Sequence, residues 1–134
     1  MFFSVIIPTY NRLPILRKCL QALAQQETLE PVKVYEVIVV DDGSKDGTWD
    51  WLNGYQQQMP QVRCFRQKNA GPAAARNLGL DQAKGDIIVF IDSDLVVTKS
   101  FLQAHGDALK RGFKTFGHQR IFTYGAVINT CNFD

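Results

Sequence analysis

Two carboxylates follow an apolar segment near the middle of the chain. The apolar strand predicted over residues 86–91 delivers Asp92 and Asp94 to its C-terminal tip. In an open parallel α/β sheet, ligands bind beyond the carboxyl ends of the strands. Two carboxylates about 4 Å apart repel each other by roughly 4 kcal/mol at an effective dielectric of ~20, so leaving them unpaired is costly unless a cation binds. Because oxygen ligands without sulfur favour Mg²⁺ or Mn²⁺, the segment predicts a site for a divalent metal and phosphate.

Polar side chains also follow two other predicted strands. The segments Pro8–Asn11 and Asp41–Ser44 each come directly after an apolar run. If the three strands are neighbours, these groups and residues 92–94 meet along one rim of the sheet. Tyr10 could then offer its ring to a base, and Asp42 could accept a hydrogen bond from a base N–H or a ribose hydroxyl. Taken alone, the segment 41–44 is more typical of a turn and a helix cap.

The segment 68–77 adds a candidate anion site. A helix is predicted to begin at Gly71, and the unpaired N–H groups and dipole of a helix start favour an anion. Arg76, one turn further on, could reach the same crevice or pair with a carboxylate such as Asp81. Lys68 is interpreted as an ordinary loop lysine. A D-x-D pair alone is a weak signal, so only the combination of segments favours a ligand site.

Hydrophobic periodicity predicts alternating strands and helices. Strands are expected at Phe3–Ile7, Val34–Val40, Val62–Phe65 and 86–91, with another within Tyr124–Thr130. Helices are expected after an N-cap at Asn11, after a cap at Asp46 with Trp49 and Leu52 on the apolar face, from Gly71 through Ala83, and from a cap at Thr98 to a stop at Gly112. This order specifies an α/β fold of three α/β/α layers around a mostly parallel sheet with right-handed crossovers.

Length, charge and cysteine spacing limit the classes of protein to which this chain can belong. The 134 residues predict one domain over residues 1–134, and a formal net charge of +2 is too small for a nucleic-acid footprint. The sequence shows neither a basic leader nor an apolar stretch near the ~20 residues of a membrane span, so we expect a cytoplasmic protein without a transmembrane segment. Cys19, Cys64 and Cys131 form no C-x-x-C pair, which favours reduced, packed thiols over disulfides or zinc.

Four segments together resemble a known family. In chain order they are FSVIIPTYNR, YEVIVVDDGSKDGT, NAGPAAARNLGL and GDIIVFIDSD. At these spacings they resemble the nucleotide-binding half of a family 2 glycosyltransferase with the Rossmann-like GT-A fold, over about residues 2–112. The resemblance implies a nucleotide-sugar donor, most often UDP-linked, a divalent metal held through the D-x-D motif, and transfer with inversion at the anomeric carbon.

The resemblance also implies roles for particular residues. Pro8, Thr9 and Tyr10 would line the site for the base and ribose. Asp42 would contact the uracil or an equivalent base, and Arg76 would help to hold the nucleotide.

The D-x-D segment would bind the rest of the donor. Asp92 would face the ribose and donor sugar, with Ser93 beside it, and Asp94 would be the principal metal ligand on the diphosphate, assisted by Asp92. A metal there neutralises the charge that develops as the sugar–phosphate bond breaks, which is Lewis-acid assistance to a leaving group.

One part of the family pattern is missing. An inverting transferase needs a general base for the acceptor hydroxyl, and in the family this is an acidic residue that follows the fifth strand. After Asp107 the only carboxylate side chain is that of Asp134. We therefore expect a chain truncated after the fifth strand, which lacks the acceptor half as a fragment or an unusually short relative, and whose catalytic base is unknown.

Two histidines could substitute for that base. His105 falls on the apolar face of its predicted helix, where a packed, hydrogen-bonded histidine is more typical than a catalytic one. His118 lies in a loop and is not expected to contact a ligand. The segment Tyr124–Ile128 would be either the family's fifth strand or an exposed apolar edge that promotes self-association.

Five functions are compared on this basis. The leading hypothesis is a metal-dependent glycosyltransferase acting on a glycan, lipid or other hydroxyl acceptor, in polysaccharide or cell-envelope synthesis and with peripheral membrane association conceivable. A module that binds a nucleotide sugar without turnover is the main alternative. A dinucleotide oxidoreductase lacks its G-x-G-x-x-G turn, and a P-loop enzyme lacks its lysine motif. A nucleotidyltransferase remains open and would release pyrophosphate from a nucleoside triphosphate.

Overall fold

The computed structural model describes residues 1–117, 121–123 and 125. Strands and helices alternate in the predicted order. The strands are β1 (Phe2–Thr9), β2 (Val34–Asp41), β3 (Val62–Arg66) and β4 (Ile87–Phe90). The helices are α1 (Leu13–Ala24), α2 (Thr48–Gln58), α3 (Pro72–Gln82) and α4 (Phe101–Phe116). The strand predicted within Tyr124–Thr130 lies outside the described residues.

All four described strands are parallel, in the order β3-β2-β1-β4. The register pairs Thr9 with Asp41 and Ile6 with Phe90, so β1 is flanked by β2 and β4. The carboxyl ends of these three strands therefore meet at one edge of the sheet. The three strands are thus neighbours, which was the condition for a shared rim. The polar segments that follow these strands therefore lie side by side.

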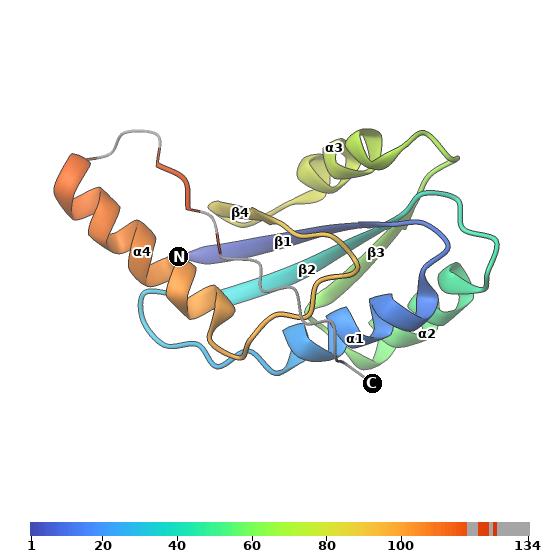
Figure 1. The fold of residues 1–134 in the computed structure, drawn as a ribbon, viewed down its shortest axis with the longest axis horizontal. Coiled ribbons are helices and arrows are strands. Elements are labelled where there is room, and N and C mark those ends of the chain that lie inside the picture. Colours follow the sequence, from blue (N-terminus) through green and yellow to red (C-terminus); the bar gives the residue numbers. More distant parts are fainter. Residues whose placement is uncertain (118–120, 124, 126–134) are drawn as a thin grey trace.

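Helices cover both faces of the sheet, which confirms the three-layer prediction. Figure 1 shows α3 on one side of the strands and α1 and α2 on the other. Because side chains alternate along a strand, Val5 and Ile7 pack with α1, whereas Ile6 packs against α3. A Cβ on Gly79 of α3 would clash with Ile6, so this glycine allows the close approach of helix and strand.

A buried polar network connects β1, β2 and β3 to the backbone that follows α3. Glu36 of β2 accepts hydrogen bonds from Ser4 Oγ (2.7 Å), Arg63 Nη1 (2.9 Å) and Lys84 N (2.8 Å). Burial acts to raise the pKa of Glu36, but these hydrogen bonds and the nearby Arg63 charge outweigh it and lower that pKa. The hydrophobic pattern of the sequence did not predict this network, because Glu36 is visible there only as a polar residue that interrupts an apolar run.

Three helix ends differ from the sequence-based prediction. Arg12, rather than Asn11, occupies the N-cap of α1, because the Asn11 side chain accepts a hydrogen bond from Lys45 N in the neighbouring loop. Ser100, rather than Thr98, occupies the N-cap of α4. Gly112 lies inside α4, where a Cβ would be 3.1 Å from Ile121 Cγ2, and the helix ends at Gly117.

Three further predictions need correction. Trp51, not Trp49, packs with Leu52 against the core, because the Trp49 ring lies beside the Arg66 guanidinium, 5.8 Å from its centroid. The strand predicted over 86–91 is shorter and only partly buried, since within the described residues β4 pairs with β1 alone. Gly47, rather than the predicted Asp46, occupies the N-cap of α2, and Asp46 accepts a hydrogen bond from Thr48 N from one residue further upstream.

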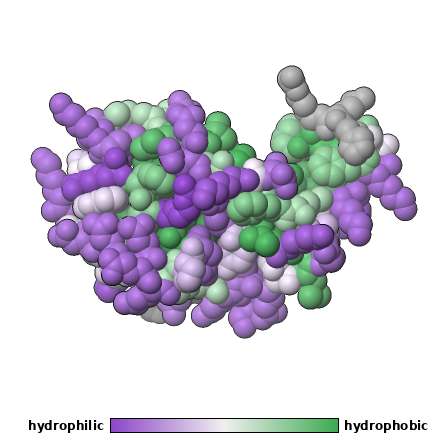
Figure 2. All heavy atoms as spheres, turned by 180° about the vertical axis from the view of Figure 1, so that it is seen from behind, coloured by the Kyte–Doolittle hydropathy of each residue, from purple (hydrophilic) through white to green (hydrophobic). Residues whose placement is uncertain are grey.

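One face of the molecule is mostly hydrophilic. Figure 2 shows hydrophilic side chains over most of the face opposite to that of Figure 1, with hydrophobic side chains exposed in smaller areas. Exposed large hydrophobic residues include Phe90 of β4 and Phe116 of α4. Within the described ranges, every helix is too short or too polar to cross a bilayer.

Candidate functional site

A cavity of about 570 Å³ opens at the carboxyl ends of β1, β2 and β4 and the start of α3. All of the sequence-predicted donor and metal residues line it: Pro8, Thr9, Tyr10, Asp42, Arg76, Asp92, Ser93 and Asp94. It is also lined by Asn69, Gly71 and Pro72, which belong to the segment predicted as an anion site, and by Arg12, for which no site role was predicted. Four segments that are distant in sequence thus form one concave surface, a common arrangement for ligand sites in parallel sheets.

The two carboxylates of the D-x-D segment are each paired with an arginine across the cavity. Asp92 Oδ1 lies 2.6 Å from Arg76 Nη2, and Asp94 Oδ2 lies 3.4 Å from Arg12 Nη1. The expectation that these carboxylates need a cation is therefore met, in this structure, by guanidinium groups. Arg76 was expected either to reach the crevice or to pair with a carboxylate such as Asp81. It reaches the crevice, where it pairs with Asp92.

Asp42 is buried, with 4% of its surface exposed, and its carboxylate holds the segment that leads into α3. It accepts hydrogen bonds from Gln67 Nε2 (2.8 Å), Asn69 Nδ2 (3.3 Å), Ala70 N (2.7 Å) and Gly71 N (3.0 Å). Burial acts to raise the pKa of Asp42, but the hydrogen bonds outweigh it and lower that pKa.

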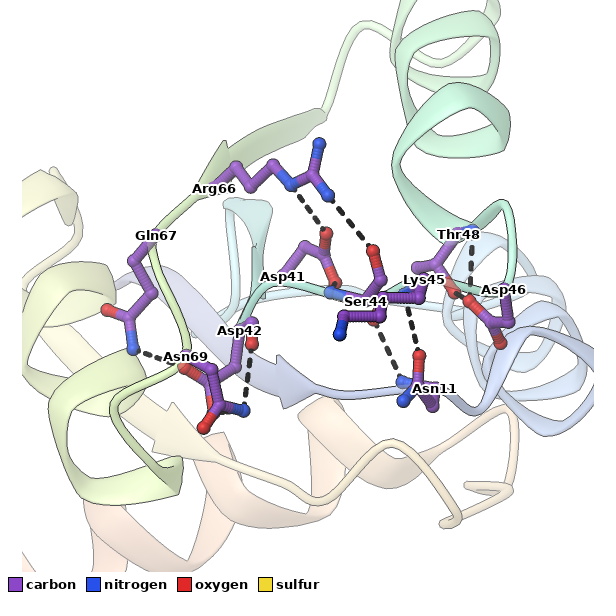
Figure 3. Close-up of polar contacts among 10 residues, drawn as sticks. All are labelled: Asn11, Asp41, Asp42, Ser44, Lys45, Asp46, Thr48, Arg66, Gln67 and Asn69. Atoms are coloured by element: carbon purple, nitrogen blue, oxygen red, sulfur yellow. Dashed lines mark hydrogen bonds and ion pairs between the residues drawn. The ribbon is translucent and has the colours of Figure 1, made fainter.

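The contacts of Asp42 change the interpretation of the anion site predicted at the start of α3. The backbone N–H groups of Ala70 and Gly71 already receive an anion, which is the Asp42 carboxylate itself. The turn predicted for 41–44 is formed by Asp41 rather than by Asp42, since Asp41 Oδ1 accepts a hydrogen bond from Ser44 N at 3.1 Å. Figure 3 shows Asp41 directed toward Arg66, and Asp42 toward the Gln67–Asn69 segment.

Asn11 braces the loop that carries Tyr10 and Arg12. Its φ of +50° is in the left-handed region, which asparagine tolerates better than most residues. Asn11 N donates to Ser44 Oγ (2.8 Å), and Asn11 Oδ1 accepts from Lys45 N (2.7 Å), as Figure 3 shows. These two bonds tie the β1–α1 loop to the β2–α2 loop and fix the backbone on this side of the cavity.

Thr9 lines the cavity and carries a buried hydroxyl. Only 3% of Thr9 is exposed, and its Oγ1 has no hydrogen-bond partner among the residues that the structure describes. A buried, unpaired hydroxyl costs about 1–3 kcal/mol. Because Thr9 lines the cavity, a ligand with a polar group could satisfy this hydroxyl.

The donor set suits a divalent metal only in company with a ligand. No cluster of three or more His, Cys, Asp and Glu side chains occurs in the described part of the chain. Asp92 and Asp94 provide carboxylate oxygens that are largely exposed, at 60% and 52% of their side chains. Mg²⁺ and Mn²⁺ fit such a site when phosphate and water supply the remaining oxygens.

His105 is a packed histidine, as predicted. Its Nδ1 lies 2.6 Å from Thr123 Oγ1, and its ring meets the edge of Phe101 on α4. Burial lowers the pKa of His105 below its ordinary value, and the residue does not line the cavity. His118 and Cys131 lie outside the described residues.

Two cysteines are packed in the described part of the chain: Cys19 lies beneath the site, and Cys64 lies next to α2. The thiols of Cys19 and Cys64 are free, and Cys19 Sγ lies 4.0 Å from the backbone oxygen of Asp92. Burial raises the pKa of each thiol to about 12, and the Asp94 charge adds to the effect at Cys19. Both thiols are packing groups, which agrees with the sequence-based prediction.

Alkylation of these two cysteines is expected to be very slow in the folded protein. At pH 8 a thiol with a pKa near 12 has a thiolate fraction roughly 10³-fold below that of an ordinary cysteine. Iodoacetamide labelling of the peptides that carry Cys19 and Cys64, followed by mass spectrometry, tests this. The same peptides from protein unfolded in guanidinium serve as the control, and equal labelling rates in the two samples would contradict the assignment.

The sequence matches the family model described as glycosyl transferase family 2 over residues 4–130. Among similar proteins is one from Bacillus subtilis (strain 168) named uncharacterized glycosyltransferase YfnE. It is 42% identical over 102 residues, which make up 76% of this chain and 25% of that protein.

Two solved structures share the fold. Staphylococcus aureus TarS 1–349, crystallised with UDP-GlcNAc, has a TM-score of 0.73 and 34% identity, and the match covers 83% of this chain and 32% of that chain. The mannosyltransferase PcManGT from Pyrobaculum calidifontis, in complex with GDP-Man and Mn²⁺, has a TM-score of 0.68 and 30% identity, and the match covers 81% and 31%. This chain thus spans about a third or less of the length of these relatives.

Proposed function

This chain belongs to glycosyltransferase family 2, and on that premise we propose that it is the donor-binding part of an enzyme that transfers a sugar from a nucleotide sugar. The donor is UDP-linked, the reaction needs a divalent metal, and the configuration at the anomeric carbon inverts. One observation carries the proposal: the cavity at the strand ends gathers the polar residues of all four motifs.

The proposal assigns the base and ribose to the side of the cavity formed by Pro8, Thr9 and Tyr10. The Thr9 hydroxyl, which has no partner among the described residues, and the half-exposed Tyr10 ring support this placement. The complex of TarS with UDP-GlcNAc supports a uridine donor, whereas PcManGT was crystallised with a guanosine donor. Asp42 would contact the base while it also holds the α3 segment in place.

Asp92 and Asp94 would hold the divalent metal, with Asp94 as the principal ligand, and Ser93 would line the donor site between them. The Mn²⁺ in the PcManGT complex supports a metal of this class. When bound, the metal supplies charge neutralisation of the diphosphate leaving group. Arg76 lies within reach of the same segment and would add positive charge toward the nucleotide.

Donor binding without turnover is the second candidate, and the state of the cavity carboxylates favours it for this chain. Asp42 is occupied by four donors, and Asp92 and Asp94 each face an arginine. Among the described residues, no other carboxylate lines the cavity, so none there is placed to deprotonate an acceptor. Sugar transfer to a glycan, lipid or other hydroxyl acceptor separates the two candidates.

The cytoplasmic location, the membrane-surface association and the role in envelope glycans stay predictions.

Melting temperatures with UDP, GDP and ADP, each with and without Mn²⁺, test donor binding. We expect the melting temperature to rise most with UDP and Mn²⁺ together. A ligand at about 100 times its dissociation constant adds roughly 2.7 kcal/mol to stability. EDTA should reverse the metal-dependent part of the rise. A folded sample that responds to none of the three nucleotides would rule out the proposed donor site in this chain.

A further inference from the structure

Arg12 is paired with the carboxylate that the proposed function assigns to the metal. We propose that Arg12 is a built-in counter-cation of Asp94, which a divalent metal displaces when the donor diphosphate arrives. The metal would then bind together with the nucleotide rather than before it. This inference rests on the proposed function and concerns the order of binding at the same site.

Both carboxylates of the D-x-D segment have a positive partner from another part of the chain. Arg12 reaches Asp94 from the β1–α1 loop, with Nη1 3.4 Å from Oδ2, and Arg76 reaches Asp92 from α3, with Nη2 2.6 Å from Oδ1. The two acids and the two arginines carry no net charge as a group. A cation that enters this site must therefore compete with a guanidinium at each carboxylate.

The backbone of Arg12 is fixed, but its side chain is free to move. Asn11, the preceding residue, is bonded to Ser44 and Lys45, and Arg12 O accepts the first hydrogen bond of α1 from Leu16 N at 2.9 Å. The Arg12 side chain is 57% exposed. Exposed ion pairs are weak and exchange readily, so Arg12 can leave Asp94 without disturbing the loop.

Displacement of Arg12 creates a place for the diphosphate. Once a metal holds Asp94, the guanidinium no longer has its carboxylate partner and remains at the cavity wall. Phosphate oxygens are favourable partners for a guanidinium, which can donate two parallel hydrogen bonds. Metal and nucleotide each improve the site for the other, and this coupling is reciprocal by thermodynamic necessity.

Arg12→Gln separates the two halves of this coupling. We expect the variant to bind Mn²⁺ alone about two- to fivefold more tightly, since one competing cation is lost. The same variant should bind UDP in saturating Mn²⁺ more weakly, by about tenfold, since a charge-assisted contact to the diphosphate is lost. A merely structural role for Arg12 would not move the two affinities in opposite directions.

The measurements are electron paramagnetic resonance of free Mn²⁺ for the metal alone and titration calorimetry for UDP with Mn²⁺. Arg12→Lys keeps the charge and should leave the affinity for Mn²⁺ alone nearly unchanged. Lys18→Gln, an exposed position on α1 outside the cavity, is the matched control for loss of one positive charge.

The unchanged protein distinguishes failure of this inference from failure of the proposed function. If it does not bind UDP in Mn²⁺, the proposed donor site is wrong. If it binds UDP in Mn²⁺ but Arg12→Gln has an unchanged affinity for UDP in Mn²⁺, or an affinity for Mn²⁺ alone that is measurably no higher than that of the unchanged protein, only the counter-cation role is overturned.

Discussion

Replacement of Asp94 by alanine is expected to abolish the effect of Mn²⁺ on UDP affinity while leaving the free protein folded. Asp94 lies beyond the strand at the cavity mouth, and its exposed pair with Arg12 contributes at most about 1 kcal/mol to stability. Loss of the proposed principal metal ligand should raise the dissociation constant for UDP in Mn²⁺ at least tenfold, which corresponds to about 1.4 kcal/mol. Titration calorimetry with and without the metal measures both quantities.

The matched control is Asp81→Ala. It removes one exposed carboxylate from α3 outside the cavity and should change neither affinity. The metal-free affinity of Asp94→Ala for UDP should be unchanged or higher, since a negative charge near the diphosphate is gone and Arg12 is released. Retention of the full Mn²⁺ effect in Asp94→Ala would show that the metal site is elsewhere.

Replacement of Asp42 by alanine is expected to lower the free energy of unfolding by about 3 kcal/mol, because it breaks a buried hydrogen-bond network. The change leaves four donors of the 67–71 segment without their acceptor, two of them backbone N–H groups at the start of α3. UDP affinity should also fall, with or without metal, because this segment forms one wall of the cavity. Urea unfolding and calorimetry below the melting transition separate the two effects.

The stability contribution of Asp42 should depend on pH with a definite sign. Its folded-state pKa is lowered, so the contribution is present above the unfolded-state pKa, near ~4, and is lost as pH falls through the folded-state pKa. Asp42→Asn removes this carboxylate, and stability should therefore decline less steeply below about pH 4 than in the unchanged protein. Glu36, whose pKa is also lowered, contributes acid sensitivity of the same sign in both proteins. Parallel acid profiles for the two proteins would contradict the assignment.

These two residues also show how far prediction from sequence extends. Asp42 and Asp94 were both identifiable as polar groups at the ends of apolar strands, because a parallel sheet brings such ends to one edge. What each carboxylate bonds to was not identifiable. Asp42 meets backbone N–H groups 28 and 29 residues away, and Asp94 meets an arginine 82 residues away.

Arg12 and Glu36 were missed for the same reason. Arg12 sits inside a recognisable motif, but nothing in its local spacing indicates an acid across the cavity. Glu36 interrupts an apolar run, and its role depends on the strand register that sets Ser4 beside it. The one available signal for Glu36 was a charged residue within a strand that is otherwise buried, since such a charge needs partners.

The sequence by itself determined the order of strands and helices, the parallel α/β class and most of the residues at the cavity. Each depends on patterns within a few turns of helix or one strand length, in which apolar periodicity and turn residues act locally. Only the tertiary structure decided which charges pair, which helix start already holds an anion and which hydroxyl has no partner within the described part of the chain. Such pairings depend on strand order and register, because these bring together atoms that are far apart along the chain.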